Sequence, residues 1–348
     1  MKSRVLNLCL AVCLLLAVNI THGQNLDNPG AYMSAVSNAQ TEMNQKYMAY
    51  SSAVAHGRRA KKIEKMRQQT LESINNARYK TIDLPIYKGD NSLRQAGTEY
   101  IQFCYNVFNE DYKRIVNMEE IAEQSFDGMQ AYILLQEKTG EKLKEASDKM
   151  NNACKTFAAK YNVNLVDSKD ALSEKMEVAA KLNHYTNQVY LVFFKCNWEY
   201  NQVIDAMNKK KVNDIEQARN AVIKYADDGL AQLTADSLKS FQNDPSLAVA
   251  CKQALQYYKK AAENEIPKLT DFYLKEEAFT KLKKTMDSKP DRTQADVDTY
   301  NKGVKDYNAS VQAFNQINTN LNNGGNQASQ NWQNTEKAFA DTHMPYYK

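Results

Sequence analysis

A run of cations is the most concentrated chemical feature of this chain. This basic segment follows His56 and consists of Arg58, Arg59, Lys61 and Lys62. Cations placed together suit the charged groups of anionic glycans and lipid head groups. The same pattern is also typical of a charged helix boundary that only faces water, and this plainer interpretation is the one we favour from the sequence. The basic segment is therefore a candidate binding surface without a catalytic role.

Other titratable groups lack the spacing that catalysis or metal binding requires. His184 has Lys181 and Gln188 about one turn away on either side, which is typical of a solvated helix face. Two carboxylate clusters, Glu119-Glu120 and Lys275-Glu276-Glu277, fall at inferred helix ends, where they suit capping or surface charge. Phosphate-binding loops, nucleophile elbows and zinc-protease motifs are absent from the sequence. We expect no metal site and no cofactor, and the sequence leans away from an enzyme without excluding one.

Tyrosine is unusually frequent, with 21 copies. A tyrosine places an apolar ring in a core and its hydroxyl at the edge of that core, which suits thin helical bundles. Interfaces and ligand grooves use the same property, but we favour the first role. The pairs Tyr257-Tyr258 and Tyr346-Tyr347 are candidates for exposed surface. Tyr257 and Tyr258 join the basic segment in the predicted binding surface.

Four cysteines follow the segment 1–23: Cys104, Cys154, Cys196 and Cys251. Each falls on an apolar helical stripe, where a free thiol behaves as a small buried hydrophobe. We therefore expect buried thiols. One or two disulfides stay an open alternative in an exported protein, whereas no Cys/His spacing of a zinc site is present.

Helix-start and helix-stop signals divide the chain into long helices. Four sites carry the signature of a helix start: Asn28-Pro29, Asn213, Asp244-Pro245 and Thr293. Asp167 or Ser168 should cap a further helix. Pro267 should interrupt a helix. The sequence Asn322-Asn-Gly-Gly325 should end another, which leaves a short separate helix near Trp332 to Phe339.

The strongest helical periodicity lies between residues 182 and 207. Spacings of mostly three and four predict one buried face that includes Val189, Val192, Phe193, Cys196, Val203 and Met207. Lys195 and Glu199 should lie outside this face. Since no segment alternates with period two over the length of a strand, the sequence predicts an all-α fold, an elongated antiparallel helical bundle.

The two halves of the chain look alike when one is shifted along the other. Arg59 to Glu64 resembles Lys211 to Glu216, and Ser92-Leu93 resembles Ser246-Leu247. This similarity predicts two tandem three- or four-helix units. The expected organisation has four parts: a signal peptide at 1–23, an N-terminal helical unit at 24–165, a C-terminal helical unit at 166–323 that repeats the first, and a C-terminal tail with a short helix at 324–348.

The segment 1–23 has the order of a secretory signal peptide. Lys2 and Arg4 precede an apolar run from Val5 to Val18, and small residues end at Gly23. The chain carries a net charge of +4, and removal of Lys2 and Arg4 lowers it to +2. A net charge so close to zero gives no electrostatic attraction that would favour binding to nucleic acid. No later segment has the length of apolar sequence that a bilayer span needs.

The layout resembles uncharacterised exported all-helical surface and hypothetical protein families of Bacteroidetes and spirochaetes. The resemblance implies a location in the cell envelope, periplasmic, cell-surface or extracellular, and no activity. We expect a protein that binds or scaffolds at the envelope, with an envelope protein or a glycan as partner and an oligomeric state that the sequence does not define. The alternatives are an exported helical bundle that binds haem, metal or a small ligand, or acts as an enzyme, and a membrane-active helical protein.

Overall fold

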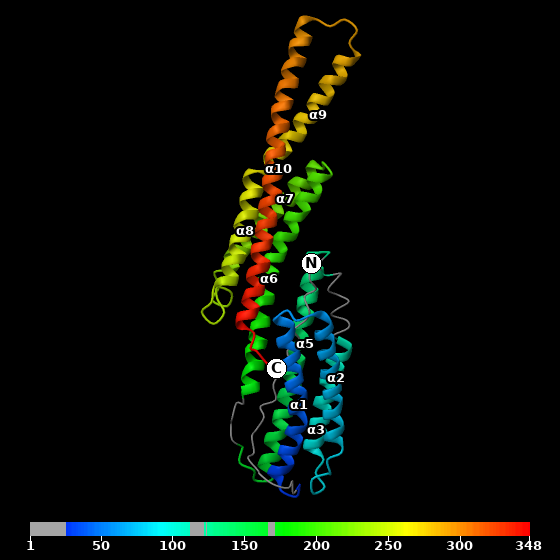
Figure 1. Ribbon diagram of the computed structural model, residues 1–348, viewed down its shortest axis with the longest axis vertical. Coiled ribbons are helices and arrows are strands. Elements are labelled where there is room, and N and C mark those ends of the chain that lie inside the picture. Colours follow the sequence, from blue (N-terminus) through cyan, green and yellow to red (C-terminus); the bar gives the residue numbers. More distant parts are fainter. Residues whose placement is uncertain (1–25, 112–121, 123, 166–170) are drawn as a thin grey trace. The chain divides into compact units, whose positions relative to one another are not determined.

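The structure, a computed structural model, describes residues 26–111, 122, 124–165 and 171–348 (Figure 1). Within these ranges the chain is built of helices: α1 (Pro29–Ala55), α2 (Ala60–Ile82), α3 (Ser92–Asn106), the π-helix η1 (Val107–Asp111), α5 (Phe126–Lys160), α6 (Ala171–Asn208), α7 (Val212–Gln232), α8 (Ser246–Asn264), α9 (Ile266–Ser288) and α10 (Gln294–His343). The described residues form no strand beyond two isolated bridges. The all-α prediction is confirmed. The predicted signal peptide, the predicted cap at Asp167 or Ser168, and Glu119-Glu120 lie outside the described residues.

The chain divides into two compact units. The first comprises residues up to Asn187 together with Lys337–Lys348, and the second comprises Gln188–Glu336. Helices α6 and α10 therefore each contribute residues to both units. The predicted boundary between residues 165 and 166 falls where the described residues stop, and the predicted tandem organisation stays a prediction.

Local cap chemistry starts three of the helices. The Asn28 side chain accepts hydrogen bonds from Gly30 N and Ala31 N at the start of α1, and Pro29 follows it. Ser125 caps α5 in the same way. At α10, Thr293 and Asp296 bind each other's backbone N–H groups reciprocally. Each cap satisfies donors that a helix N-terminus leaves unpaired, so these starts follow from the sequence alone.

The core of the second unit contains the face of α6 that periodicity predicted. Val189, Cys196 and Val203 are fully buried, and the other three members, Val192, Phe193 and Met207, are also buried. Phe193 stacks on Trp332 of α10, with ring centroids 4.4 Å apart and planes 10° apart. Lys195 and Glu199 are only partly exposed.

An aromatic cluster anchors one end of the first unit. Tyr32 of α1, Tyr87 of the loop before α3 and Phe157 of α5 are almost fully buried, and each ring lies within 5.7 Å of the other two. Their hydroxyls reach the backbone: Tyr32 donates to Pro85 O and Tyr87 to Asp27 O. These tyrosines have the predicted role of a buried ring with its hydroxyl at the edge of a core.

The turns that follow α1 and α6 have the same geometry. Each contains a residue in the left-handed region, Gly57 with φ of 63° and Lys210 with φ of 54°. The next residue donates its N–H to the carbonyl five positions back in both turns. The shift that relates position 57 to position 210 is close to the one that relates Ser92 to Ser246 in the sequence.

The loops before α3 and α8 also match each other. Both are closed by an isolated antiparallel bridge. Asp90 Oδ1 accepts a hydrogen bond from Ser92 N at 2.9 Å, and Asp244 Oδ1 accepts one from Ser246 N at 2.8 Å. The two turns and the two loops thus recur at nearly the same shift along the chain. The recurrence lets equivalent positions of the two halves be compared.

Two predicted helix boundaries are wrong. Asn213 lies inside α7, which begins at Val212 after Lys211, and Lys211 makes no side-chain cap. The predicted stop at Asn322 to Gly325 does not occur, because α10 continues to His343. A Cβ on Gly324 would lie 2.3 Å from Tyr257 Oη, and one on Gly325 would lie 2.9 Å from Tyr200 Cε1. The glycines therefore allow tyrosines to approach the helix and do not end it.

The break at Pro267 is confirmed. Helix α8 ends at Asn264, and Pro267 lies in the first turn of α9, where its missing N–H costs no intrahelical hydrogen bond.

None of the four described cysteines forms a disulfide, and all four are buried. Burial raises the pKa of the Cys154 thiol to about 11 and that of Cys196 to about 12. Because the thiolate is the reactive form, these side chains act as core hydrophobes, as the sequence indicates.

Candidate functional site

The basic segment lies at the turn between α1 and the first turn of α2. All four side chains are exposed. Within the described residues, none of them forms an ion pair. The segment follows the C-terminus of α1, where the helix dipole favours cations, and enters the N-terminus of α2, where the dipole disfavours them. The two dipoles act in opposite directions, so the feature that sets this segment apart is its lack of carboxylate partners.

The corresponding turn after α6 gives a direct comparison. It carries three lysines, and each has a carboxylate partner: Lys209 pairs with Asp205, Lys210 with Glu276 and Lys211 with Asp214. Both turns are thus basic, and Arg58 corresponds to Lys211 at the shift that relates Gly57 to Lys210. Only the turn after α6 has its counter-charges within the described chain.

A histidine–aspartate pair lies beside the basic segment. His56 Nδ1 is 2.6 Å from Asp341 Oδ1, and this hydrogen bond lowers the pKa of the Asp341 carboxyl below its usual value. The imidazole stacks on the Tyr346 ring with centroids 3.7 Å apart and planes 7° apart. The His56 side chain is only 4% exposed, and its Nε2 is enclosed without a hydrogen-bond partner. An enclosed imidazole cannot reach a substrate, so in this arrangement His56 holds Tyr346 in place.

Residues 344–348 lie along α1 and complete this surface. Met344 is 2% exposed, and Tyr347 N donates to Ser52 Oγ at 3.1 Å. Lys175 Nζ donates to Tyr346 O at 3.0 Å and lies 5.4 Å from the centroid of the Tyr347 ring. Several separate contacts therefore hold the end of the chain on the first unit.

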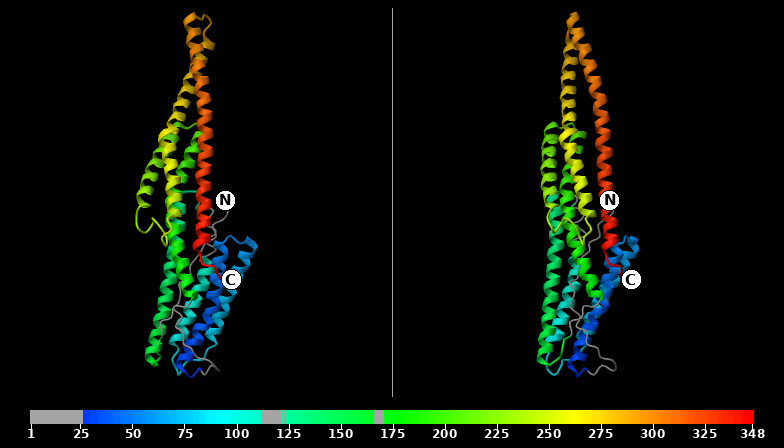
Figure 2. Two further views of the ribbon diagram at one scale, coloured as in Figure 1. Left: turned by 60° about the vertical axis from the view of Figure 1, so that its left-hand side comes forward. Right: turned by 90° about the vertical axis from the view of Figure 1, so that its left-hand side faces the viewer.

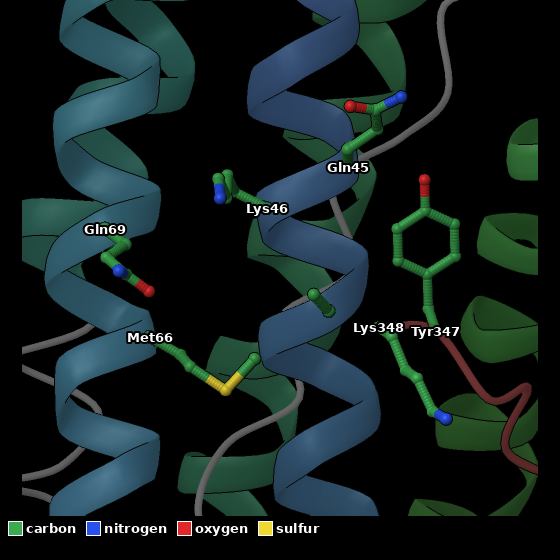
Figure 3. A pocket seen from close by; sticks show the side chains of 7 residues that line it. Gln45, Lys46, Met66, Gln69, Tyr347 and Lys348 are labelled. Carbon is green, nitrogen blue, oxygen red and sulfur yellow. The ribbon is translucent and has the colours of Figure 1, made fainter.

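A pocket opens between α1, α2 and the end of the chain (Figure 3). Its volume is about 410 Å³. Seven residues line it: Gln45, Lys46, Ala49, Met66, Gln69, Tyr347 and Lys348. Neither Lys46 nor Lys348 forms an ion pair within the described chain. In Figure 3 the Lys46 side chain lies between α1 and α2, and the Lys348 side chain lies on the other side of α1. Each ammonium group suits a carboxylate, sulfate or phosphate group.

The prediction that Tyr257 and Tyr258 form an exposed binding surface is wrong. Tyr258 is completely buried, and its hydroxyl donates to Asn197 Oδ1 at 2.8 Å. Tyr257 is half-buried, with its hydroxyl 3.2 Å from Leu321 O. Both belong to the second unit and serve its packing, because their rings pack against Tyr200 and each other. Tyr346, by contrast, is 58% exposed.

The other predicted surface charges are paired on helix surfaces. His184 is 61% exposed and lies 3.3 Å from Glu137. In the cluster at 275–277, Lys275 pairs with Asp271, Glu276 with Lys210 and Glu277 with Lys281. In the part of the chain that the structure describes, no three His, Cys, Asp or Glu side chains gather as a metal site would need. None of the described helices is both long and apolar enough to cross a bilayer.

The His56–Asp341 pair was missed by sequence reasoning. Its members are 285 residues apart, and neither belongs to a motif. The only available signal was the position of His56 beside the basic segment.

Comparison of the chain with protein-family models, with curated proteins and with solved structures finds no match.

Proposed function

We propose that the protein is exported to the cell envelope and binds anionic glycan there through the first unit. The basic segment supplies the main contact, and the pocket lined by Lys46 and Lys348 accommodates one charged substituent. The observation that carries this proposal is the contrast between the two halves. Lysines in the turn after α6 all have partners within the chain, whereas the basic segment has none among the described residues.

A glycan fits this surface better than a lipid bilayer. Binding to a membrane surface usually combines cations with apolar side chains that enter the interface. Within residues 58–65 the one large apolar side chain is Ile63, and it is half-buried. The pocket has charged and amide groups at its opening, which suit hydroxyl, carboxylate and sulfate groups of a sugar chain.

Neutralising the basic segment should weaken binding to a sulfated polysaccharide by about tenfold or more. The variant carries Arg58→Gln, Arg59→Gln, Lys61→Gln and Lys62→Gln. Each exposed ion pair contributes about 0.2–1 kcal/mol, so the loss of four contacts is large although each is small. Heparin serves as the probe, and the measurement is its dissociation constant at several salt concentrations. The variant should also show a shallower salt dependence.

The matched control changes Lys209, Lys210 and Lys211 to glutamine. These lysines occupy the equivalent turn and are already paired, so heparin affinity should change little. Equal weakening in both variants would mean that binding follows net charge and not this surface, and the proposal would be wrong.

The proposed export predicts a defined N-terminus for the exported protein. Cleavage after Gly23 should leave Gln24 as the first residue, because the small residues at 21–23 follow the apolar run. N-terminal sequencing of protein recovered from the envelope or medium tests this. Retention of residues 1–23 would indicate an uncleaved anchor.

A further inference from the structure

Helices α9 and α10 form a long hairpin within the second unit. We define the hairpin as α9 with residues 294–320 of α10. Figures 1 and 2 show it extending beyond the ends of α6, α7 and α8 of the same unit. Its turn is held by Lys289, which bonds both carboxylate oxygens of Asp296, and by the Thr293 cap. The hairpin is therefore a defined element.

The apolar seam of the hairpin is not covered. From Leu274 to Asn320, a stretch the structure describes throughout, no side chain is buried. This stretch nevertheless carries large apolar residues at helical spacing: Phe279, Leu282, Met286, Val297, Tyr300, Val304, Tyr307, Val311, Phe314 and Ile317. Two helices alone cannot enclose such a seam, since a bundle core needs further helices around it.

Aromatic rings hold the two helices together along this seam. Phe279 stacks on Tyr307 with centroids 4.7 Å apart and planes 10° apart. Phe272 stacks on Phe314 with centroids 4.3 Å apart. A Cβ on Gly303 would lie 2.6 Å from Leu282 Cδ2, so the helices approach closely there. The rings are thus fixed in position while one side of them stays open.

The open side forms a groove with opposite charges on its two walls. Its volume is about 580 Å³. Phe279, Leu282 and Tyr307 supply apolar lining, with Lys275 from α9 and Asp306 from α10. Lys275 pairs with Asp271 on its own helix, whereas Asp306 forms no ion pair in the described chain.

We propose that the hairpin is a self-association site at which a second copy of this chain docks its own hairpin. Two hairpins packed face to face form a four-helix bundle, which encloses both seams. Around a twofold axis, α9 of one copy lies against α10 of the other. Lys275 of each copy then meets Asp306 of its partner, because a twofold contact uses the same patch twice. Opposite charges on the two walls make this groove self-complementary.

The contact is tested by sedimentation of the mature chain over a range of concentrations. Wild type should be dimeric at about 100 μM, since a specific contact of ordinary size has a dissociation constant near or below about 10 μM. Lys275→Asp and Asp306→Lys should each be monomeric, because each places like charges together twice across the axis. Both changes lie at the exposed rim, and circular dichroism verifies that each variant keeps its helices.

Two combinations of these charge reversals test the pairing of Lys275 with Asp306 across the dimer. An equimolar mixture of the Lys275→Asp and Asp306→Lys chains should form a heterodimer, because every contact then joins opposite charges. The double variant should again form a homodimer. Leu274→Ser, which alters an apolar residue 54% exposed and outside the seam, should leave the dimer unchanged.

A monomeric wild type at every concentration would overturn the proposal, as would single variants that stay dimeric or fail to pair when mixed. The proposal does not depend on glycan binding, since the basic segment and the hairpin belong to different units.

Discussion

Replacing Trp332 with alanine should lower the free energy of unfolding of the second unit by about 3–5 kcal/mol. The side chain is 2% exposed, and its ring stacks on Phe193, which is itself buried. Protein interiors are close-packed, so the indole leaves a cavity that neighbouring side chains fill only in part. The stacking contact is lost as well, which adds about 0.5–1.5 kcal/mol to the area term.

Trp198 provides a matched control, because the chain has two tryptophans. Trp198 lies on α6 and is only partly buried, so Trp198→Ala should cost clearly less than Trp332→Ala. Urea unfolding followed by circular dichroism measures both, and the remaining tryptophan gives a second signal by fluorescence. Equal losses would show that Trp332 is not the more deeply packed of the two.

The helix starts at Asn28 and Thr293 and the main core face could be predicted because their causes are local. Asn28 and Thr293 bind backbone groups two or three residues away. The face of α6 that includes Val189 and Val203 follows from spacing alone. In such cases the residue type and its near neighbours contain the physical reason for the structure.

The histidine pair could not be predicted in the same way, whereas the burial of Tyr258 could have been. Tyr258 follows Leu247, Cys251 and Leu255 at spacings of three and four along α8, all of which are buried, and Tyr257 lies one position off that face. His56 gains its role from Asp341 and Tyr346 near the other end of the chain. These contacts follow from tertiary packing, which no spacing within one segment reports.

The basic segment was found from the sequence, but its significance was not. A charged turn is usually a solvated surface, and sequence alone favours that interpretation. The lysines in the turn after α6 show that a basic turn can have its counter-charges within the fold. Lys210 pairs with Glu276, which lies 66 residues away in the sequence. The absence of equivalent partners for the basic segment became visible only once both turns were described.

Gly324→Ala should destabilise the protein by about 1–3 kcal/mol, although this substitution usually stabilises a helix by about 0.5–1 kcal/mol. The new methyl group would lie 2.3 Å from Tyr257 Oη and 2.6 Å from its Cε2. The ring cannot easily move away, because the Tyr257 hydroxyl donates to Leu321 O at 3.2 Å and lies 3.5 Å from the Tyr200 hydroxyl.

Two further variants separate this contact from helix propensity. Gly140 lies inside α5, and a Cβ there meets no atom within 4 Å, so Gly140→Ala should raise the free energy of unfolding by about 0.5–1 kcal/mol. In a Tyr257→Ala background the obstruction is gone, and Gly324→Ala should then stabilise by a similar amount. Such a reversal of sign means that the two positions are energetically coupled. Urea unfolding of the wild type, the two single variants and the double variant measures this coupling free energy. If Gly324→Ala stabilises the wild-type protein as Gly140→Ala does, the close approach of Tyr257 does not explain why α10 keeps glycine where the sequence predicts a helix end.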